Sequence, residues 1–298
     1  MIKVFKSASG KERVHSSYNE LLSQWGTEHR ESTITTKYGL THCISSGNPL
    51  NPPLLLFHGV GDNSAVMWLL NMKELSRHFY CIAVDTLGGP GKSIPGERFN
   101  KRTFDQVDWM NGVADGLNLE HFYVAGVSNG AYMAFNYTVH EPRRVLKTVC
   151  MEGGMVTAPL KSMLHTLLMM FPEILVPTHS NLLKVARKLS SPASGFFDKH
   201  PEVGEHLVLL MKNHNQQAMF PHKLQPYDKE KAIAVRDKLY FLLGDYKLRH
   251  KKEFLGILED GGFRYSVIPD AGHGLNHEQP ERVNRELIDY LKGRDVHI

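Results

Sequence analysis

The feature that most constrains this fold is the pentapeptide Gly126-Val127-Ser128-Asn129-Gly130. The apolar run 122–125 before it is typical of a short buried strand, and the run 131–137 after it indicates a buried helix. A serine in a G-x-S-x-G pattern between a strand and a helix predicts a nucleophile elbow, a sharp turn that exposes the hydroxyl. The flanking glycines are expected where neighbouring backbone passes too closely for a Cβ. The alternative is an incidental serine in a Gly-rich turn.

Strands and helices alternate along most of the chain. Strands are predicted over 54–57, 80–84, 122–125, 145–151, 239–243 and 265–268. Helices are predicted over 15–25, 65–75, 103–117, 131–137, 251–259 and 280–291. An antiparallel hairpin is expected over 32–47, turning near Tyr38-Gly39. Such alternation predicts an α/β fold with a mostly parallel, doubly wound sheet and helices on both faces.

The alternation breaks over residues 155–232, where no strand is predicted. Apolar helical segments over 163–170, 182–189 and 206–211 are separated by prolines. An all-helical insertion in an α/β domain is interpreted as a cap over the strand ends. We therefore expect a core domain of residues 1–154 and 233–298 and a helical cap of residues 155–232.

Composition excludes several classes of protein. The 298 residues are 42% hydrophobic, with a net charge of +4, as in ordinary soluble proteins. Cys43, Cys81 and Cys150 lie in or beside apolar runs and are expected to be buried core residues. The basic cluster 249–252 is interpreted as a solvated helix start, so no nucleic-acid partner is expected. Without a secretory signal or an apolar segment of spanning length, the protein is expected to be cytoplasmic with no membrane span. The oligomeric state stays open.

A serine needs a base to take its proton and donors to stabilise the oxyanion. His273, in Gly272-His273-Gly274 after the last predicted strand, is the candidate base. The candidate oxyanion donors are the backbone N–H groups of Asn129, directly after Ser128, and of Val60, in the Gly-rich loop after the first buried strand. The alternatives are an exposed loop histidine and a bland Gly-rich turn.

With these features in register, the chain resembles the α/β-hydrolase fold family over nearly its full length, and within it the bacterial naproxen-type carboxylesterases. The residues that carry the resemblance to the esterases are Tyr18-Asn19-Glu20 with Trp25, 36–42, His58-Gly59, Ser64 with Met67-Trp68, and 85–93. The resemblance implies a serine carboxylesterase (EC 3.1.1 class) that works through an acyl-enzyme intermediate and needs no cofactor. The Met- and Leu-rich cap points to a small, largely apolar ester as substrate.

The third member of the catalytic triad departs from the family pattern. Most members carry the acid three residues after the glycine that ends the seventh strand, but here that glycine is Gly244 and the position is Lys247. Two carboxylates could take its place: Glu152, after strand 145–151, and Asp245. Glu152 is preferred because haloalkane dehalogenases and some lipases place their acid there. A helix cap or a surface charge is the structural alternative for Glu152.

Other functions stay open at this point. Serine hydrolases of this fold also cleave C–C, amide or lactone bonds, and Lys247 raises the alternative of a ligand-binding or signalling protein with weak activity. Residues 86–93 nearly match a phosphate-binding loop, but Thr86 stands where a glycine is needed and Pro90 lacks an N–H group. His273 and His277 lack a metal-site pattern, so no zinc is expected.

Overall fold

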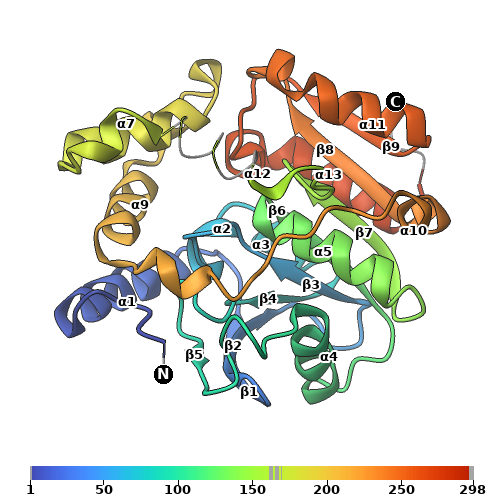
Figure 1. Cartoon of the computed structure of the whole chain (residues 1–298), viewed down its shortest axis with the longest axis horizontal. Coiled ribbons are helices and arrows are strands. Elements are labelled where there is room, and N and C mark those ends of the chain that lie inside the picture. The colour runs from blue at the N-terminus through green and yellow to red at the C-terminus, as the bar shows by residue number, and fades with distance from the viewer. Residues whose placement is uncertain (1, 161–163, 165–167, 169, 295–298) are drawn as a thin grey trace.

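The structure is a computed structural model that describes residues 2–160, 164, 168 and 170–294. Its centre is one sheet with the strand order β1-β2-β4-β3-β6-β7-β8-β9 (Figure 1). These strands are β1 (His29–Thr36), β2 (Gly39–Ser46), β3 (Pro53–Phe57), β4 (Tyr80–Val84), β6 (Phe122–Val127), β7 (Val145–Met151), β8 (Leu239–Gly244) and β9 (Arg264–Ile268). The path from β4 to β9 is parallel, whereas the hairpin β1–β2 is antiparallel and the short β5 (Ile94–Pro95) pairs with β2.

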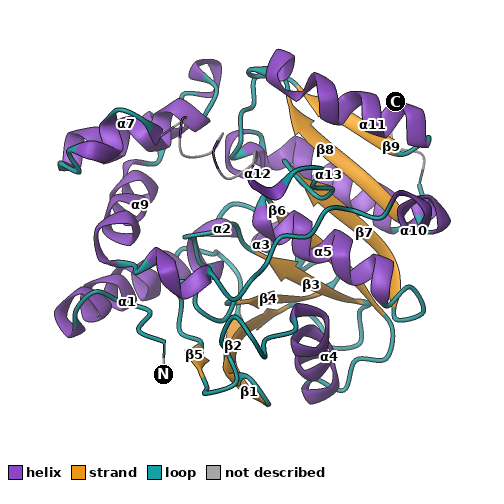
Figure 2. Cartoon of the chain, in the orientation of Figure 1, coloured by secondary structure: helices purple, strands orange, loops and turns teal. Residues whose placement is uncertain are grey.

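Helices cover both faces of this sheet (Figure 2). Leu54 and Leu56 of β3 face the cluster built with α1 (Ala8–Ser23), α2 (Ser64–Met67), α3 (Met72–Leu75) and α13 (Pro280–Leu291). Leu55 and Phe57 face the opposite cluster, built with α4 (Gln106–Gly116) and α5 (Asn129–His140). Alternate side chains of one strand thus enter two cores, as the continuous apolar strand requires. The predicted α/β class and mostly parallel sheet are confirmed.

The predicted helices 15–25 and 65–75 differ most from the observed ones. Helix α1 begins at Ala8, earlier than predicted, because the Ser7 hydroxyl accepts a hydrogen bond from Gly10 N at 3.0 Å and caps the helix there. The single helix predicted over 65–75 is two short helices, α2 and α3. The buried Asn71 lies between them and donates from Nδ2 to Asn284 Oδ1 at 2.8 Å, a tertiary contact.

The described part of residues 155–232 contains helices and no strand. These are η1 (Glu173–Leu175), α7 (His179–Leu189), η2 (Pro192–Ser194), α8 (Phe196–Lys199), α9 (Pro201–Asn213), η3 (Gln216–Met219) and α10 (Lys229–Ala234). The predicted segments 182–189 and 206–211 fall within α7 and α9, and most of segment 163–170 lies outside the described residues. Helices α7 and α9 stand at one side of the sheet (Figure 1). The division into core and cap domains stays a proposal.

Two expectations about single features can be compared with the structure. Cys43, Cys81 and Cys150 are free and buried, as predicted. A bilayer-spanning helix is absent from the part of the chain that the structure describes.

Candidate active site

Ser128 lies at the sharp turn between β6 and α5. Its backbone has φ 57° and ψ −115°, a conformation that residues other than glycine rarely adopt. The turn is anchored by its own N–H group, which donates to Met151 O on the neighbouring strand β7 at 2.8 Å. A strained serine held by its surroundings is the backbone geometry that a nucleophile elbow requires.

The glycines on either side of Ser128 make this turn possible. A Cβ on Gly126 would lie 2.2 Å from Gly130 O, and a Cβ on Gly130 would lie 2.2 Å from Phe57 O. A Cβ on Gly59 would lie 3.6 Å from Ser128 Cβ, so the loop after β3 packs directly against the serine. The close backbone approach that the sequence predicts is therefore present on both sides of the elbow.

The two predicted oxyanion donors belong to this junction. Asn129 is the first residue of α5, and Val60 lies in the loop after β3. Among the described residues, neither backbone N–H group has a hydrogen-bond partner. The buried His58 steadies the loop, because its Nδ1 donates to Gly59 O at 2.8 Å and its Nε2 accepts from Thr86 N at 3.0 Å. Burial lowers the pKa of His58, which keeps Nε2 free to accept.

His273 lies in the loop between β9 and α12 (Leu275–Glu278), with a half-exposed side chain. Its Nδ1 is 3.4 Å from Glu152 Oε2, longer than an ordinary hydrogen bond but within ion-pair range. The Ser128 hydroxyl makes no hydrogen bond to His273 or to any other described residue. Catalytic hydrogen bonds are often long before substrate binds, so this geometry leaves His273 as the candidate base.

Glu152 follows β7 directly, and its carboxylate is almost fully buried. Its backbone has φ 53°, which turns the side chain towards the end of β8. There Oε1 accepts from Gly244 N at 2.7 Å and from Lys251 Nζ at 2.5 Å, while Oε2 faces His273. Burial raises the pKa of Glu152, but its interactions with His273 and Lys251 outweigh burial, and the net pKa lies below the usual value. The carboxylate is therefore ionised beside the imidazole.

The other candidate carboxylate points elsewhere. Asp245 is exposed, and its Oδ1 accepts from Ala271 N at 3.3 Å without contacting the His273 ring. Lys247, at the usual acid position, donates from Nζ to Lys188 O of α7 at 2.9 Å. The structure thus brings Glu152 to His273 and leaves Asp245 apart.

Lys251 is a site residue that the sequence did not reveal. The basic cluster 249–252 was expected to be solvated, and for Lys251 this prediction is wrong. Its side chain is 20% exposed and its ammonium also donates to Gly244 O at 2.9 Å. No local pattern marks this lysine, because its partner lies 99 residues away along the chain.

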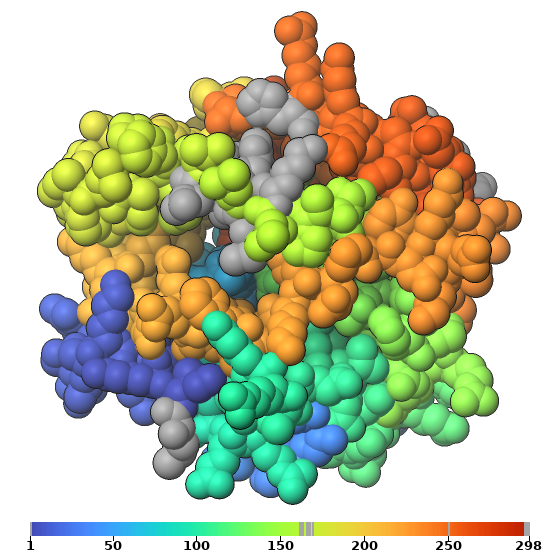
Figure 3. Space-filling model, viewed as in Figure 1, coloured from blue at the N-terminus to red at the C-terminus, as the bar shows by residue number. Residues whose placement is uncertain are grey.

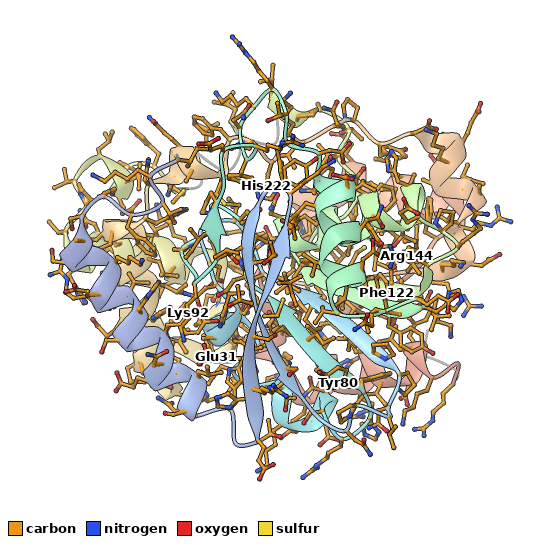
Figure 4. All side chains as sticks on the ribbon, turned by 90° about the horizontal axis from the view of Figure 1, so that it is seen from below. Glu31, Tyr80, Lys92, Phe122, Arg144 and His222 are labelled. Atoms are coloured by element: carbon orange, nitrogen blue, oxygen red, sulfur yellow. The ribbon has the colours of Figure 1, made fainter. Side chains whose placement is uncertain are left out.

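Residues 86–93, the segment that resembles a phosphate-binding loop, contact the carboxylate of Asp85. The buried Asp85 accepts from Lys92 N at 2.9 Å, and a Cβ on Gly91 would lie 2.3 Å from Asp85 Cγ. The Lys92 ammonium pairs with Glu31 (Figure 4). A buried negative charge at the centre of this loop argues against nucleotide binding.

The candidate site opens at the carboxyl ends of the parallel strands, where ligands bind in open α/β sheets. Figure 3 shows a hollow between the yellow and orange helices α7 and α9 and the green part of the chain, with blue atoms of the α2 region at its floor. Val60 is 55% exposed, so the loop that carries the candidate oxyanion donor also offers an apolar surface. This arrangement suits nucleophilic attack on a polarised carbonyl.

Known proteins are similar to this chain in sequence and in fold. Residues 52–182 match the family described as alpha/beta hydrolase fold. Carboxylesterase YbfK of Bacillus subtilis (strain 168) is 26% identical, and the alignment covers 94% of either chain. An uncharacterized carboxylesterase of the same strain, nap, is 28% identical over 94% of this chain and 92% of its own. The crystal structure of carboxylesterase CesB (YbfK) from Bacillus subtilis superposes with a TM-score of 0.79 at 25% identity, covering 97% of this chain and 100% of that one.

Proposed function

Because this chain is an α/β-hydrolase-fold protein that is similar to Bacillus carboxylesterases over 94% of its length, we propose that it hydrolyses carboxylic esters through an acyl-enzyme intermediate. The observation that carries the proposal is the elbow geometry of Ser128 at the sheet edge where Glu152 meets His273. The rarity of φ 57° for a serine supports a functional role for this turn.

In the proposed acylation step, Ser128 Oγ attacks the ester carbonyl carbon and its proton passes to His273. Nδ1 of His273 faces Glu152, so Nε2 is the nitrogen left to accept that proton. The developing oxyanion is bound by the unpartnered N–H groups of Asn129 and Val60. The tetrahedral intermediate then collapses, and His273 returns the proton to the departing alkoxide.

Deacylation reverses the roles with water as the nucleophile. His273 takes a proton from water, the hydroxide attacks the acyl carbon, and the Ser128 oxygen leaves with the proton that His273 returns. Ionised Glu152 holds the imidazole in one tautomer and stabilises the imidazolium in both steps. The proposed steps use no cofactor or metal.

We propose further that residues 155–232 form a cap that selects a largely apolar ester. Apolar side chains are exposed in this segment; they include Leu160, Leu164, Leu168, Phe171 and Leu175. Met169 of this segment lies outside the described residues, whereas Phe171 is described and is 51% exposed.

Phe171→Ala should change the ratio of kcat/KM for short and long acyl chains, with little effect on labelling of Ser128. Leu146→Ala, which truncates a 41% exposed apolar residue at the start of β7, is the matched control and should leave the profile unchanged. If both variants and the wild type have the same ratio of kcat/KM for short and long acyl chains, this would count against a substrate-facing cap.

The function is tested by turnover of p-nitrophenyl esters together with fluorophosphonate labelling and mapping of the labelled residue. We expect turnover by the wild type, labelling of Ser128, and loss of nearly all of both in a folded Ser128→Ala protein. Labelling of Ser128 without turnover would favour the ligand-binding alternative. Labelling of another residue would refute the nucleophile assignment. The cytoplasmic location stays a prediction.

A further inference from the structure

We propose that Glu278 is a positioning residue that holds the His273 loop in place against the segment after α7. The inference rests on the proposed hydrolysis by Ser128 and His273. Glu278 is the last residue of α12 and is only 7% exposed, so its carboxylate is buried.

The Glu278 carboxylate gathers three backbone donors from two segments. Oε2 accepts from Ser191 N at 2.7 Å and from Gly272 N at 3.0 Å, and Oε1 accepts from Gly274 N at 3.2 Å. Two of these donors flank His273 in the chain, and the third, Ser191, is the second residue after α7. One side chain thus joins the candidate base to the helical segment 155–232.

The residue between the two glycines is held by α7 itself. His273 N donates to Leu189 O, the last carbonyl of that helix, at 2.8 Å. The contact is close, because a Cβ on Gly272 would lie 2.3 Å from the same oxygen. All three backbone N–H groups from residue 272 to residue 274 are therefore engaged, so the backbone that carries the imidazole is held in place.

A carboxylate is required for this pattern of bonds. No ion pair is found for Glu278 among the described residues, and its oxygens are bound by backbone N–H dipoles instead. Burial raises the pKa of Glu278 above its usual value, and the backbone N–H donors and the Ser194 hydroxyl offset only part of that rise. A glutamine would offer one acceptor oxygen, and its amide N–H groups would face backbone N–H groups.

The proposal predicts a loss in turnover rather than in binding. A displacement of about 1 Å at a catalytic group can cost on the order of 100-fold in rate. Glu278→Gln should therefore lower kcat about 10- to 100-fold, while KM stays within about twofold. The rate constant for fluorophosphonate labelling of Ser128 should fall in parallel, because it depends on the same base.

Two pairs of variants separate positioning from general stability. Glu286→Gln removes a carboxylate that is 8% exposed and accepts from Tyr240 Oη at 2.6 Å in the core, so it matches the burial of Glu278 away from the loop. Ser191→Pro removes the N–H donor and points the ring Cδ at the Glu278 carboxylate, so it breaks this contact, while φ −68° at Ser191 and the extended backbone of Ser190 suit proline. Ser191→Ala keeps that donor.

The expected result is a fall in kcat for Glu278→Gln and Ser191→Pro, with Glu286→Gln and Ser191→Ala within about twofold of the wild type. Circular dichroism and urea unfolding establish that each variant is folded. If folded Glu278→Gln and Ser191→Pro keep wild-type kcat, the positioning role is refuted. If Glu286→Gln loses kcat equally, the effect is one of stability and the proposal fails. A wild type that neither turns over esters nor labels at Ser128 refutes the proposed function instead.

Discussion

At the scale of single residues, the candidate site depends on how Glu152 is held. Its two oxygens serve different groups: Oε1 takes Gly244 N and Lys251, and Oε2 is left for His273. Because every donor around Oε1 is fixed, the carboxylate has one orientation towards the imidazole. A substitution that removes the charge of Glu152 but preserves its shape should therefore affect catalysis strongly.

Glu152→Gln is expected to lower kcat by up to about four orders of magnitude, the loss seen when a serine protease triad acid becomes an amide. KM should change little, because Glu152 faces the imidazole rather than the substrate pocket. Asp245→Asn is the matched control and should retain near wild-type kcat, since within the described residues the Asp245 carboxylate accepts from Ala271 N and has no hydrogen bond to His273. Steady-state kinetics on a p-nitrophenyl ester measures both. The reverse order of effects would assign the acid to Asp245.

Lys251→Met should shift the acid side of the pH–rate profile to higher pH. The Lys251 charge helps to hold the pKa of Glu152 below its usual value, so its removal raises that pKa and protonates the acid at higher pH. A carboxylate with a lowered pKa contributes stability that is lost as pH falls from the unfolded to the folded pKa, and Lys251→Met should make this contribution smaller. Lys252→Met removes an exposed charge next in sequence and should leave the profile in place. Equal shifts in both variants would show a general charge effect.

At the scale of elements, the β6–α5 junction is limited by backbone-to-backbone distance. Gly130→Ala should destabilise the protein by about 1–3 kcal/mol or more and abolish turnover, because its Cβ would lie 2.2 Å from Phe57 O. Gly256→Ala in α11 (Lys252–Gly261) is the matched control, with nothing within 4 Å of the added Cβ. Alanine favours helix, so this variant should gain about 0.5–1 kcal/mol. Urea unfolding measures both, and a stable, active Gly130→Ala protein would contradict the elbow geometry.

At the scale of the whole molecule, buried neutral histidines should make the fold sensitive to acid. Burial is the first cause that lowers the pKa of His206, His214, His222 and His277 to about 4. Their pKa in the unfolded chain is near 6.5, so between pH 6.5 and 4 the unfolded state binds more protons and stability falls as pH falls.

Unfolding in urea at pH 7 and pH 5.5 checks this sensitivity. We expect a loss of about 1 kcal/mol per histidine over this interval. His206 joins α9 to the loop after β3, because its Nε2 accepts from Asn63 Nδ2 at 3.0 Å. His206→Gln should therefore reduce the loss of stability between pH 7 and pH 5.5 by about 1 kcal/mol. A midpoint that is the same at both pH values would refute the expectation.

Local patterns in the sequence were enough to predict the sheet and its helices. The alternating elements, the buried strands and the hairpin at Tyr38-Gly39 are present because apolar periodicity and turn residues act over a few positions. The elbow could be predicted for the same reason, since strand, serine and helix are contiguous. Helix 65–75 was predicted as one piece; between the observed α2 and α3, Asn71 bonds to Asn284, 213 residues away, a contact that the local sequence does not reveal.

The surroundings of His273 could be decided only by the tertiary structure. Glu152 and Asp245 both follow parallel strands, and the sequence alone left them as rivals. Backbone conformation and burial direct the Glu152 carboxylate to the imidazole, and Lys251 and Glu278 join the site across long stretches of chain. Sequence periodicity determines which face of an element is buried. It carries no information on where a single polar side chain finds its partner, because that depends on how distant loops meet at one edge of the sheet.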